Sequence, residues 1–417
     1  MGTGGQTARL MLALTLWLMP ALASAGECRP DAVHLPPRKL TQRTKLRLLQ
    51  WGLRVAPTRR RAVVAGTPDL EGNSVEVVRA LASRMPVRWL VSAPAEELAW
   101  LLDGVPRADR VELVSRRSTR ALVSYLTSSH VFFTHGLYGS PQPPRRKTFV
   151  NLWHGDGPKR RKGFADIRSS YIVGGTELWG RRRGDTFGVG QDRVLVTGNP
   201  RIDQLARPTD ADALAALGLD PARPLVLWLP TYRRTRYRGR RLGDVRNWAD
   251  GQELSRAQPV QDILASAADC AADLGITLIV KPHPLDADRF RETGLTVLTD
   301  EDLLRARTTL YSLLGRTAGL VTDYSSVWTD YLAADRPIGY FCPDLEDYDA
   351  DRGLNVVDYR SVMAGPLLET PGDFADFLAS CLQEGDEARA HRHAIARLVG
   401  AETRPGATER LLHALGL

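Results

Sequence analysis

Cysteine is scarce in this sequence, with four cysteines among 417 residues. None belongs to a C-x-x-C pair, so we expect neither a disulfide-built scaffold nor a common zinc or redox motif. The four cysteines are interpreted as small buried apolar residues. Internal repeats and long low-complexity segments are also absent. The apolar share of 43% and the charged share of 25% are those of an ordinary folded protein, which argues against wholesale disorder and a polytopic membrane protein.

Several catalytic and nucleotide-binding signatures are absent as well. The sequence has no G-x-x-x-x-G-K-[ST], no G-x-G-x-x-G after a strand, no H-E-x-x-H and no G-x-S-x-G. It also lacks a recognisable helix-turn-helix, zinc finger or RNA-binding motif, so nucleic acid is not expected as a partner. Aspartates in Asp-x-Asp pairs are common in loops, and we expect no metal and no cofactor. The three pairs are Asp210/Asp212, Asp286/Asp288 and Asp349/Asp351.

Positive charge is in excess, since 56 lysines and arginines face 48 aspartates and glutamates and leave a net charge of +8. Such an excess indicates anionic ligands or surfaces. The basic clusters are interpreted as solvated faces, and their common sign favours docking on an anionic surface. They lie at residues 59–61, 145–147, 181–183 and 233–241.

The N-terminal segment, residues 1–28, has the layout of a secretory signal. An apolar run over residues 10–19 is followed by Pro20 and by Ala23-Ser24-Ala25, a small-residue cleavage site. The run is too short to predict a spanning helix. Three interpretations stay open: a cleaved signal of residues 1–25 that would export the protein, an uncleaved membrane-associating segment, and a start codon placed too early.

Short β-branched or aliphatic runs alternate with helical patterns from Arg61 onward. This alternation predicts an α/β fold with parallel sheets covered by helices. One helix is expected over residues 74–85, with Ser74 as its N-cap. The expected strands lie at residues 62–64, 87–91, 131–133, 148–152, 171–173, 194–197, 225–229, 276–280, 296–298, 319–322 and 337–341.

A proline-punctuated stretch near residues 206–222 divides the strands into two series. We therefore predict two Rossmann-like domains in tandem, residues 29–206 and 207–385, followed by a helical tail at residues 386–417. Ligands of open α/β sheets bind beyond the carboxyl ends of strands. Polar residues follow five of the expected strands, an arrangement that a cleft between two such domains would use. These residues are His154, Asn199 with Arg201, Pro230 with Thr231, His283, and Asp323 with Ser325 and Ser326.

Two histidines are the candidates for acid–base chemistry. His283 lies between Pro282 and Pro284, which fix the backbone and present the imidazole rigidly. His154 is followed by small residues that let a phosphate approach, and basic residues come directly behind them. His135, before Gly136, is interpreted as loop structure.

The segment from Asp323 to Leu332 predicts a strand, a tight turn and a helix that opens at Ser325 and Ser326. Free N–H groups at such a helix start, with two hydroxyls, would cradle a diphosphate. The alternative is that Ser325 only caps the helix. Asp330, one turn further, is either a solvated or capping-region carboxylate or a ligand of ribose or glycerol hydroxyls.

Taken together, these motifs resemble the CDP-glycerol glycerophosphotransferase family, which primes or polymerises teichoic-acid-type poly(glycerol phosphate). The resemblance covers about residues 145–360, and the stretch from Val321 to Gly353 is its most specific part. It implies a GT-B-like fold with two Rossmann-like domains and an interdomain cleft. Family members commonly read W-H-G-T-P-L-K, whereas this chain has Asp156-Gly157-Pro158, which would place a carboxylate beside the phosphates.

The resemblance implies roles for individual residues. His154 would be the general base and His283 the second catalytic residue. The residues expected to bind the substrates are Gly155, Asp156, Gly157, Pro158, Lys159, Arg201, Pro230, Thr231, Lys281, Ser325, Ser326 and Asp330.

The expected activity is transfer of glycerol phosphate from CDP-glycerol to a hydroxyl of a lipid-linked or polymeric acceptor, with release of CMP. Two alternatives stay open: a GT-B transferase that uses CDP-ribitol or a sugar nucleotide, and a secreted, non-catalytic module that binds anionic wall polymer. Since CDP-activated donors are cytoplasmic, we expect a peripheral protein on the cytoplasmic face of the cell membrane, in contact with its anionic surface.

Overall fold

The computed structural model describes residues 41–160, 166–231, 235–237, 245–247, 258–282, 290–291, 295–383 and 385–417. The N-terminal segment, Cys28, His283 and the pair Asp286/Asp288 lie outside the described residues, as does most of the basic cluster at 233–241.

The chain forms two compact units that are interleaved in sequence. Unit 1 comprises Met1–His154, Phe164–Ile172 and Phe187–Arg193, and unit 2 comprises Gly155–Gly163, Val173–Thr186 and Val194–Leu417. The chain therefore passes from unit 1 to unit 2 directly after His154. The division into domains at residue 206, and the cleft between them, stay predictions.

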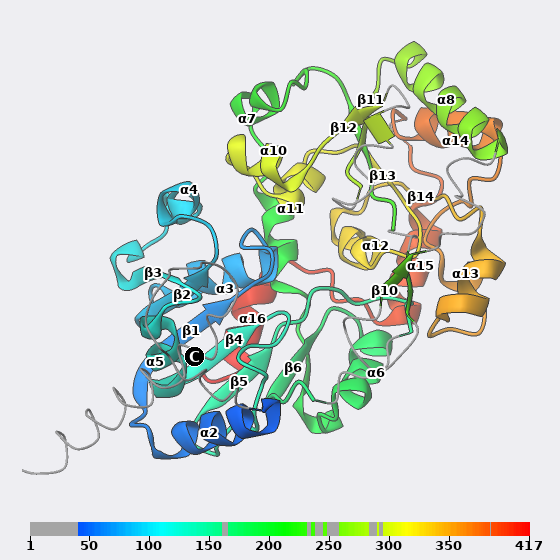
Figure 1. Cartoon of the computed structure of the whole chain (residues 1–417). Coiled ribbons are helices and arrows are strands. Elements are labelled where there is room, and N and C mark those ends of the chain that lie inside the picture. The colour runs from blue at the N-terminus through cyan, green and yellow to red at the C-terminus, as the bar shows by residue number, and fades with distance from the viewer. Residues whose placement is uncertain are drawn as a thin grey trace, which may run out of the picture. The chain divides into compact units, whose positions relative to one another are not determined.

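Unit 1 is built on a parallel sheet in the order β3-β2-β1-β4-β5 (Figure 1). Strand β5 also pairs with Tyr171 and Ile172, the first residues of β6 (Tyr171–Gly174). Buried valines and aromatic residues fill these strands, as expected of a sheet covered on both faces. The strands are β1 (Arg59–Ala65), β2 (Val87–Val91), β3 (Val111–Ser115), β4 (Ser128–Phe133) and β5 (Thr148–Asn151).

The helices of unit 1 include one whose start was predicted wrongly. Helix α3 spans Gly72–Leu81, and its N-cap is Glu71 rather than Ser74. The carboxylate of Glu71 accepts the Ser74 N–H at 3.0 Å, and the Ser74 hydroxyl donates to the Glu71 carbonyl at 2.7 Å. Ser74 therefore supports the cap from inside the first turn. The other helices are α2 (Gln42–Val55), α4 (Ala95–Leu98) and α5 (Thr119–Thr127).

Unit 2 contains a second parallel sheet, in the order β12-β11-β8-β13-β14. All residues of β8 and β13 are buried, and apolar clusters lie on both faces of the sheet. The strands are β8 (Leu225–Trp228), β11 (Thr277–Val280), β12 (Thr296–Val297), β13 (Gly319–Thr322) and β14 (Ile338–Tyr340). Unit 2 also holds β7 (Val194–Val196) and an antiparallel pair, β9 (Thr235–Tyr237) and β10 (Val245–Asn247).

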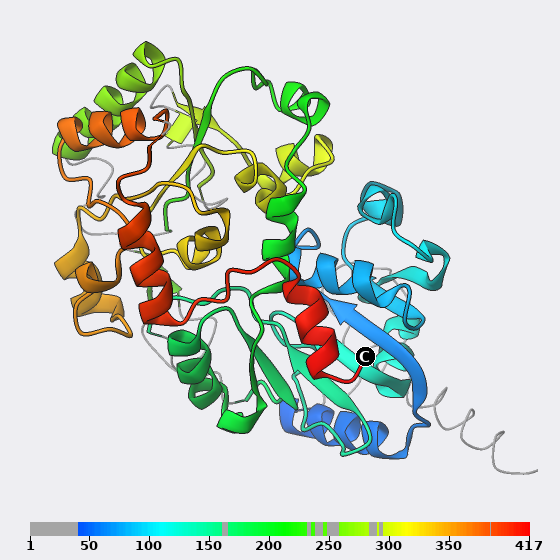
Figure 2. The same cartoon turned by 180° about the vertical axis from the view of Figure 1, so that it is seen from behind.

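Helices cover this second sheet, and α8 (Gln258–Asp273) lies beside α14 (Pro371–Ser380) in both views (Figures 1 and 2). Two helices, α15 (Arg389–Val399) and α16 (Ala407–Ala414), lie in the stretch predicted as a helical tail. The carboxylate of Asp203 accepts the N–H groups of Gly406, Ala407 and Thr408 at the start of α16, each at 2.9 Å. The remaining helices are α6 (Glu177–Phe187), α7 (Ala211–Ala216), α10 (Asp300–Arg305), α11 (Leu310–Leu314), α12 (Val327–Tyr331) and α13 (Leu345–Arg352).

All eleven predicted strands are present, with ends that differ by up to three residues. Strands β3, β9 and β10 were not predicted. Strand β3 is an edge strand with a charged residue, Glu112, which pairs with Arg88 at 2.7 Å. Of the cysteines that the structure describes, Cys342 is buried, while Cys270 and Cys381 are partly buried against the core, and no two of the three form a disulfide with each other.

Candidate functional site

His154 is the last residue of unit 1 and follows a short turn after β5. Asn151 fixes this turn, because its side-chain oxygen accepts the Trp153 N–H at 3.0 Å. Asn73 of α3 donates to the Trp153 carbonyl at 3.0 Å, and Trp153 has a φ of 51°. Such a left-handed conformation is strained for a bulky residue and persists only where the surroundings impose it.

The imidazole of His154 is held by aromatic rings. It stacks on His135, with ring centroids 4.0 Å apart and planes within 3°, and its centroid is also 4.0 Å from that of Trp153. On the other side, Trp153 packs edge-on against Phe187 at 4.8 Å. His135 is therefore more than the loop residue that the sequence predicted. A ring fixed in this way can present one nitrogen to a hydroxyl and accept its proton.

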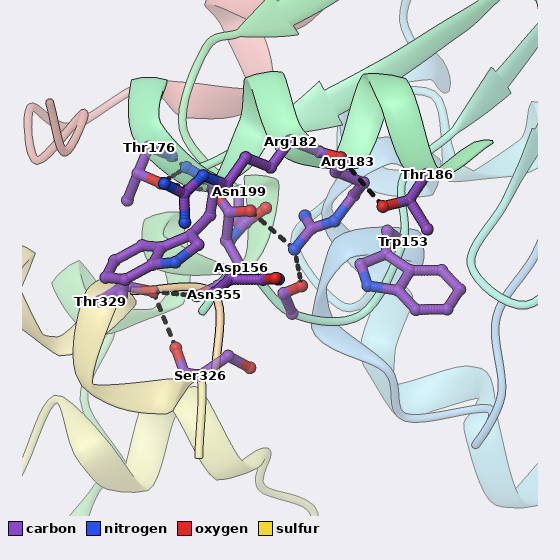
Figure 3. A network of polar contacts seen from close by, with 12 residues as sticks. Trp153, Asp156, Thr176, Arg182, Arg183, Thr186, Asn199, Ser326, Thr329 and Asn355 are labelled. Atoms are coloured by element: carbon purple, nitrogen blue, oxygen red, sulfur yellow. Dashed lines mark hydrogen bonds and ion pairs between the residues drawn. The ribbon is translucent and has the colours of Figure 1, made fainter. Parts of the chain in front are cut away.

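In unit 2, the loop at residues 155–159 lies directly against Ser326 at the start of α12 (Figure 3). A Cβ on Gly155 would lie 2.1 Å from the Ser326 hydroxyl, and one on Gly157 would lie 3.0 Å from the Ser326 Cα. Only glycine allows this approach at both positions. Further along, Asn355 donates its backbone N–H to the Pro158 carbonyl at 2.5 Å and its side-chain amide to the Lys159 carbonyl at 3.1 Å.

The sequence analysis expected the Asp156 carboxylate beside the donor phosphates. In the structure this carboxylate is not open to a ligand. It is fully buried, and its Oδ2 accepts the backbone N–H of Thr176 at 2.6 Å and the Thr176 hydroxyl at 2.9 Å. Its Oδ1 pairs with the Arg183 guanidinium at 2.6 Å. The side chain of Arg183 is only 8% exposed, so the interpretation of cluster 181–183 as a solvated face is wrong for this residue.

Asp330 of α12 is the centre of a second buried network. Arg201 donates to its Oδ2 through Nε at 2.9 Å and Nη2 at 2.6 Å, while Asn199 donates to Oδ1 at 2.7 Å. The Tyr311 hydroxyl donates to Oδ2 at 2.6 Å, and the Arg201 guanidinium lies over the Tyr311 ring. Asp330 is 3% exposed, so the solvated-carboxylate alternative is wrong. The structure brings Arg201 and Asp330 together as partners of each other.

Asp323 organises a third set of contacts at the end of β13. Its carboxylate accepts the Thr231 N–H at 2.7 Å, the Thr231 hydroxyl at 2.5 Å and the Ser325 N–H at 3.1 Å. Lys159 reaches the same place, since its Nζ donates to the Thr231 hydroxyl at 3.0 Å. Helix α12 begins after Ser326, which occupies the N-cap position, so the alternative that Ser325 caps the helix is wrong. Ser325 instead belongs to the turn that Asp323 holds.

The remaining predicted site residues lie apart from these networks or outside the description. Lys281 follows β11 and pairs with Asp300 at 2.8 Å, and Pro230 is half-buried after β8. The role of His283 stays a prediction. In the part of the chain that the structure describes, no cluster of three or more His, Cys, Asp or Glu side chains could hold a metal ion. Among the described helices, none has the length and apolar character needed to cross a bilayer.

Several residues of these networks were not assigned to the site by the sequence analysis, among them His135, Arg183 and Tyr311. His135 carried a signal, because it follows β4 just as His154 follows β5, and Phe133 is in register with Asn151 on these neighbouring strands. Arg183 and Tyr311 carried none, because an arginine in a basic helix and a tyrosine in an apolar helix suit ordinary packing.

Comparison with known proteins gives one family. A family model described as CDP-glycerol:poly(glycerophosphate) glycerophosphotransferase matches residues 67–415. The teichoic acid glycerol-phosphate transferase of Staphylococcus aureus (strain NCTC 8325 / PS 47) is 24% identical over 279 residues, which are 60% of this chain and 65% of that protein. The teichoic acid ribitol-phosphate primase of Bacillus spizizenii (strain ATCC 23059 / NRRL B-14472 / W23) is 43% identical over 58 residues, 14% of this chain and 15% of the relative. The matches thus span less than two thirds of these two relatives.

Among solved structures, a variant of the wall teichoic acid polymerase TagF superposes with a TM-score of 0.67 at 17% identity, covering 97% of this chain and 96% of the TagF chain. A TagF variant soaked with CDPG superposes with a TM-score of 0.64 at 16% identity, covering 89% of this chain and 92% of that one. This likeness confirms the predicted GT-B-like α/β fold with parallel sheets.

Proposed function

The chain belongs to the CDP-glycerol:poly(glycerophosphate) glycerophosphotransferase family, and on this premise we propose that it transfers glycerol phosphate from CDP-glycerol to a hydroxyl acceptor and releases CMP. The single observation that carries the proposal is the seating of loop 155–159 on the start of α12 in unit 2. This loop follows His154 directly, and α12 carries Ser326 and Asp330. The two glycines let the main chain after His154 pack directly against Ser326, so that the loop and the start of α12 lie side by side.

The proposed chemical step is an in-line displacement at the β-phosphorus of the donor. An acceptor hydroxyl loses its proton to His154 and forms a new P–O bond, while the bond between the β-phosphorus and the bridging oxygen breaks and CMP leaves. Such a transfer depends mainly on positioning and on neutralisation of charge. Lys159 and Ser326 are the candidate donors to the phosphates, and Arg201 with Asp330 would fix the position of α12.

A polyol other than glycerol is the second candidate for the donor. The ribitol-phosphate primase match is short but has the higher identity of the two relatives, so CDP-ribitol belongs in the test. The acceptor is proposed to be a lipid-linked or polymeric hydroxyl compound of the teichoic acid type. No metal or other cofactor is part of the proposal.

The test is a donor panel with the purified full chain. CDP-glycerol, CDP-ribitol and a sugar nucleotide are each incubated with a membrane fraction, and release of CMP or another nucleotide is followed with and without EDTA. We expect CMP from CDP-glycerol, unaffected by EDTA. Release of CMP with CDP-ribitol but not with CDP-glycerol would identify CDP-ribitol as the donor. Binding of wall polymer without release of any nucleotide would overturn the enzyme proposal in favour of a non-catalytic module.

We further propose that the protein is peripheral on the cytoplasmic face of the cell membrane and that helix α2 contacts its anionic surface. Between Asp31 and Asp69 the sequence has nine lysines and arginines and no carboxylate side chain. The exposed side of α2 presents Arg43, Arg47 and Arg54 together with Trp51, which is 41% exposed, and Val55, which is 45% exposed. Basic residues beside an exposed tryptophan suit the interface of an anionic bilayer.

Vesicle flotation tests this surface. We compare the double variant Arg47→Glu/Trp51→Ala with the matched control Arg397→Glu/Leu398→Ala on α15, where Leu398 is 62% exposed. Binding to vesicles of phosphatidylglycerol and phosphatidylcholine should fall about tenfold for the α2 variant and stay unchanged for the control. Equal losses would contradict the assignment to α2. N-terminal sequencing of the protein from its own host tests the proposed cellular location. Removal of residues 1–25 would indicate export and would contradict a location on the cytoplasmic face.

A further inference from the structure

We propose that Asp156 is a positioning residue: its buried carboxylate latches the loop that follows His154 onto α6 and α12, and so fixes the main chain that carries the base. The proposal rests on the proposed function and deepens it. It assigns a role to the carboxylate at residue 156 that does not involve contact with the donor phosphates.

The side-chain contacts of Asp156 use both carboxylate oxygens. Oδ2 takes the two donors of Thr176, and Oδ1 takes the guanidinium of Arg183 (Figure 3). The same Arg183 nitrogen also donates to the Gly155 carbonyl. The Asp156 side chain is 0% exposed, so it cannot reach a ligand without breaking these bonds. Its negative charge is neutralised by the buried arginine, and that pair ties the loop to α6.

The main chain of Asp156 makes the second attachment, to α12. The Thr329 hydroxyl lies 2.7 Å from the Asp156 carbonyl oxygen and 2.8 Å from that of Ser326, and it shares its hydrogen between them. A hydroxyl buried between two carbonyls fixes their spacing. One residue thus joins α6 through its side chain and α12 through its backbone.

Chain connectivity passes this constraint to the base. Two residues span at most about 7 Å, so the Cα of His154 stays within that distance of the Cα of Asp156 whatever the arrangement of the two units. Gly155 is the single residue between them and has no side chain to fix its own conformation. Without the latch, the loop would lose its attachment to α6, and the spacing between it and His154, which unit 1 holds by its own contacts, would no longer be fixed. A displacement of about 1 Å of a catalytic group can cost roughly 100-fold in rate.

The experiment uses a neutral pair to separate the latch from the charge. Asp156→Asn keeps the shape and one acceptor but turns an amide toward Arg183, and Arg183→Gln removes the cation. The double variant Asp156→Asn/Arg183→Gln removes both charges, so that neither a buried cation nor a buried anion is left without its partner. Arg181→Gln, an exposed position on the same helix with Glu177 as its partner at 2.7 Å, is the matched control.

For the single variant Asp156→Asn we expect kcat to fall about 100-fold while KM for CDP-glycerol changes less than about twofold. The double variant should recover to within about fivefold of the wild type, because the two losses are not additive. Arg181→Gln should behave as the wild type. Hydrogen exchange of the peptides that cover residues 155–160 and Thr176 should be faster in Asp156→Asn and restored in the double variant.

Two results would overturn the proposal. A lower KM for CDP-glycerol at unchanged kcat in Asp156→Asn would place the carboxylate against the donor phosphates. Unchanged hydrogen exchange in Asp156→Asn would show that the loop has no such latch. The exchange measurement needs no turnover, so a wild-type protein that releases no CMP would disprove the proposed function while the latch is still tested on its own.

Discussion

In unit 1 the buried cation Lys147 donates to main-chain oxygens, those of Leu126 at 2.6 Å and Ser128 at 3.5 Å. In unit 2 the buried cations Arg183 and Arg201 each lie 2.6 Å from a buried carboxylate, Asp156 and Asp330. Burial accordingly lowers the pKa of Lys147 to about 8. The same contrast holds for the candidate residues of each unit, because rings hold His154 in unit 1 whereas ion pairs hold Asp156 and Asp330 in unit 2.

On the proposed function, the two units have different tasks: unit 1 supplies the base and unit 2 binds the donor phosphates. A base that must gain and lose a proton benefits from neighbours without formal charge, because a nearby ion would favour one of its two forms. A phosphate site needs groups that do not move, and charge-assisted hydrogen bonds at buried positions supply that rigidity. On the proposed function, the paired arginines would stabilise the shape of the donor side, and His154 would take up the proton of the acceptor hydroxyl.

The largest effect is expected when the proposed base, His154, is removed. His154→Ala should lower kcat about 1000-fold, because a positioned general base contributes on this scale. Binding of CDP-glycerol, measured by calorimetry, should change little, since the paired carboxylates of unit 2 stay intact. Release of CMP at the wild-type rate in the presence of acceptor would show that His154 is not the base.

The next largest effect is expected at the Asp330 network. Asp330→Asn leaves the buried Arg201 without its carboxylate, and removal of one partner from a buried pair costs roughly 3 kcal/mol. Urea unfolding should show this loss together with weaker binding of CDP-glycerol. Asp212→Asn, at an exposed position on α7, is the control and should keep the wild-type stability. Equal free energies of unfolding in the two variants would mean that the Asp330 network does not stabilise unit 2.

Much of the fold could be predicted because buried parallel strands consist of continuous runs of aliphatic residues. The runs at residues 225–229 and 319–322 became β8 and β13 almost residue for residue. The N-cap of α3 could not be predicted, since Glu71 and Ser74 both offer a capping oxygen and only the turn geometry selects between them. Strand β3 has neither a long apolar run nor a buried environment on both sides.

The site was predicted as a set of residues but not as a set of pairs. Arg201 and Asp330 were both expected to face the donor, yet they bond to each other across 129 positions of sequence. Asp156 was expected beside phosphates because it falls in the motif that follows the histidine in the family, and nothing in the cluster of three arginines marked Arg183 as its partner. Sequence shows which residues are able to bond, whereas the packing of helices decides which of them meet.

The stack of His135 on His154 allows a test of whether aromatic packing in unit 1 holds the proposed base. His135→Ala removes one face of the stack, and because ring pairs contribute about 1 kcal/mol, kcat should fall several-fold to about tenfold. His135→Phe keeps an aromatic face and should retain most of the activity. The two variants are compared through their kcat at saturating donor and acceptor. A loss in His135→Phe as large as in His135→Ala would point to an acid–base role for His135 itself.

The smallest effect concerns Lys147 and appears as a dependence of stability on pH. An unfolded lysine has a pKa near 10.4, whereas burial lowers the pKa of Lys147 to about 8 in the folded protein. Between these two values the unfolded chain binds the proton more tightly, so the free energy of unfolding should rise as the pH increases from about 8 to 10. We expect a gain of about 1 kcal/mol, reduced by solvent screening from what the full shift would give. Urea unfolding of Lys147→Met should lack this rise, because methionine fills the same space without a proton to lose, and Lys45→Met on α2 should keep it. A rise of equal size in Lys147→Met would mean that other groups set the pH dependence and that the buried ammonium of unit 1 is as well compensated as the arginines of unit 2.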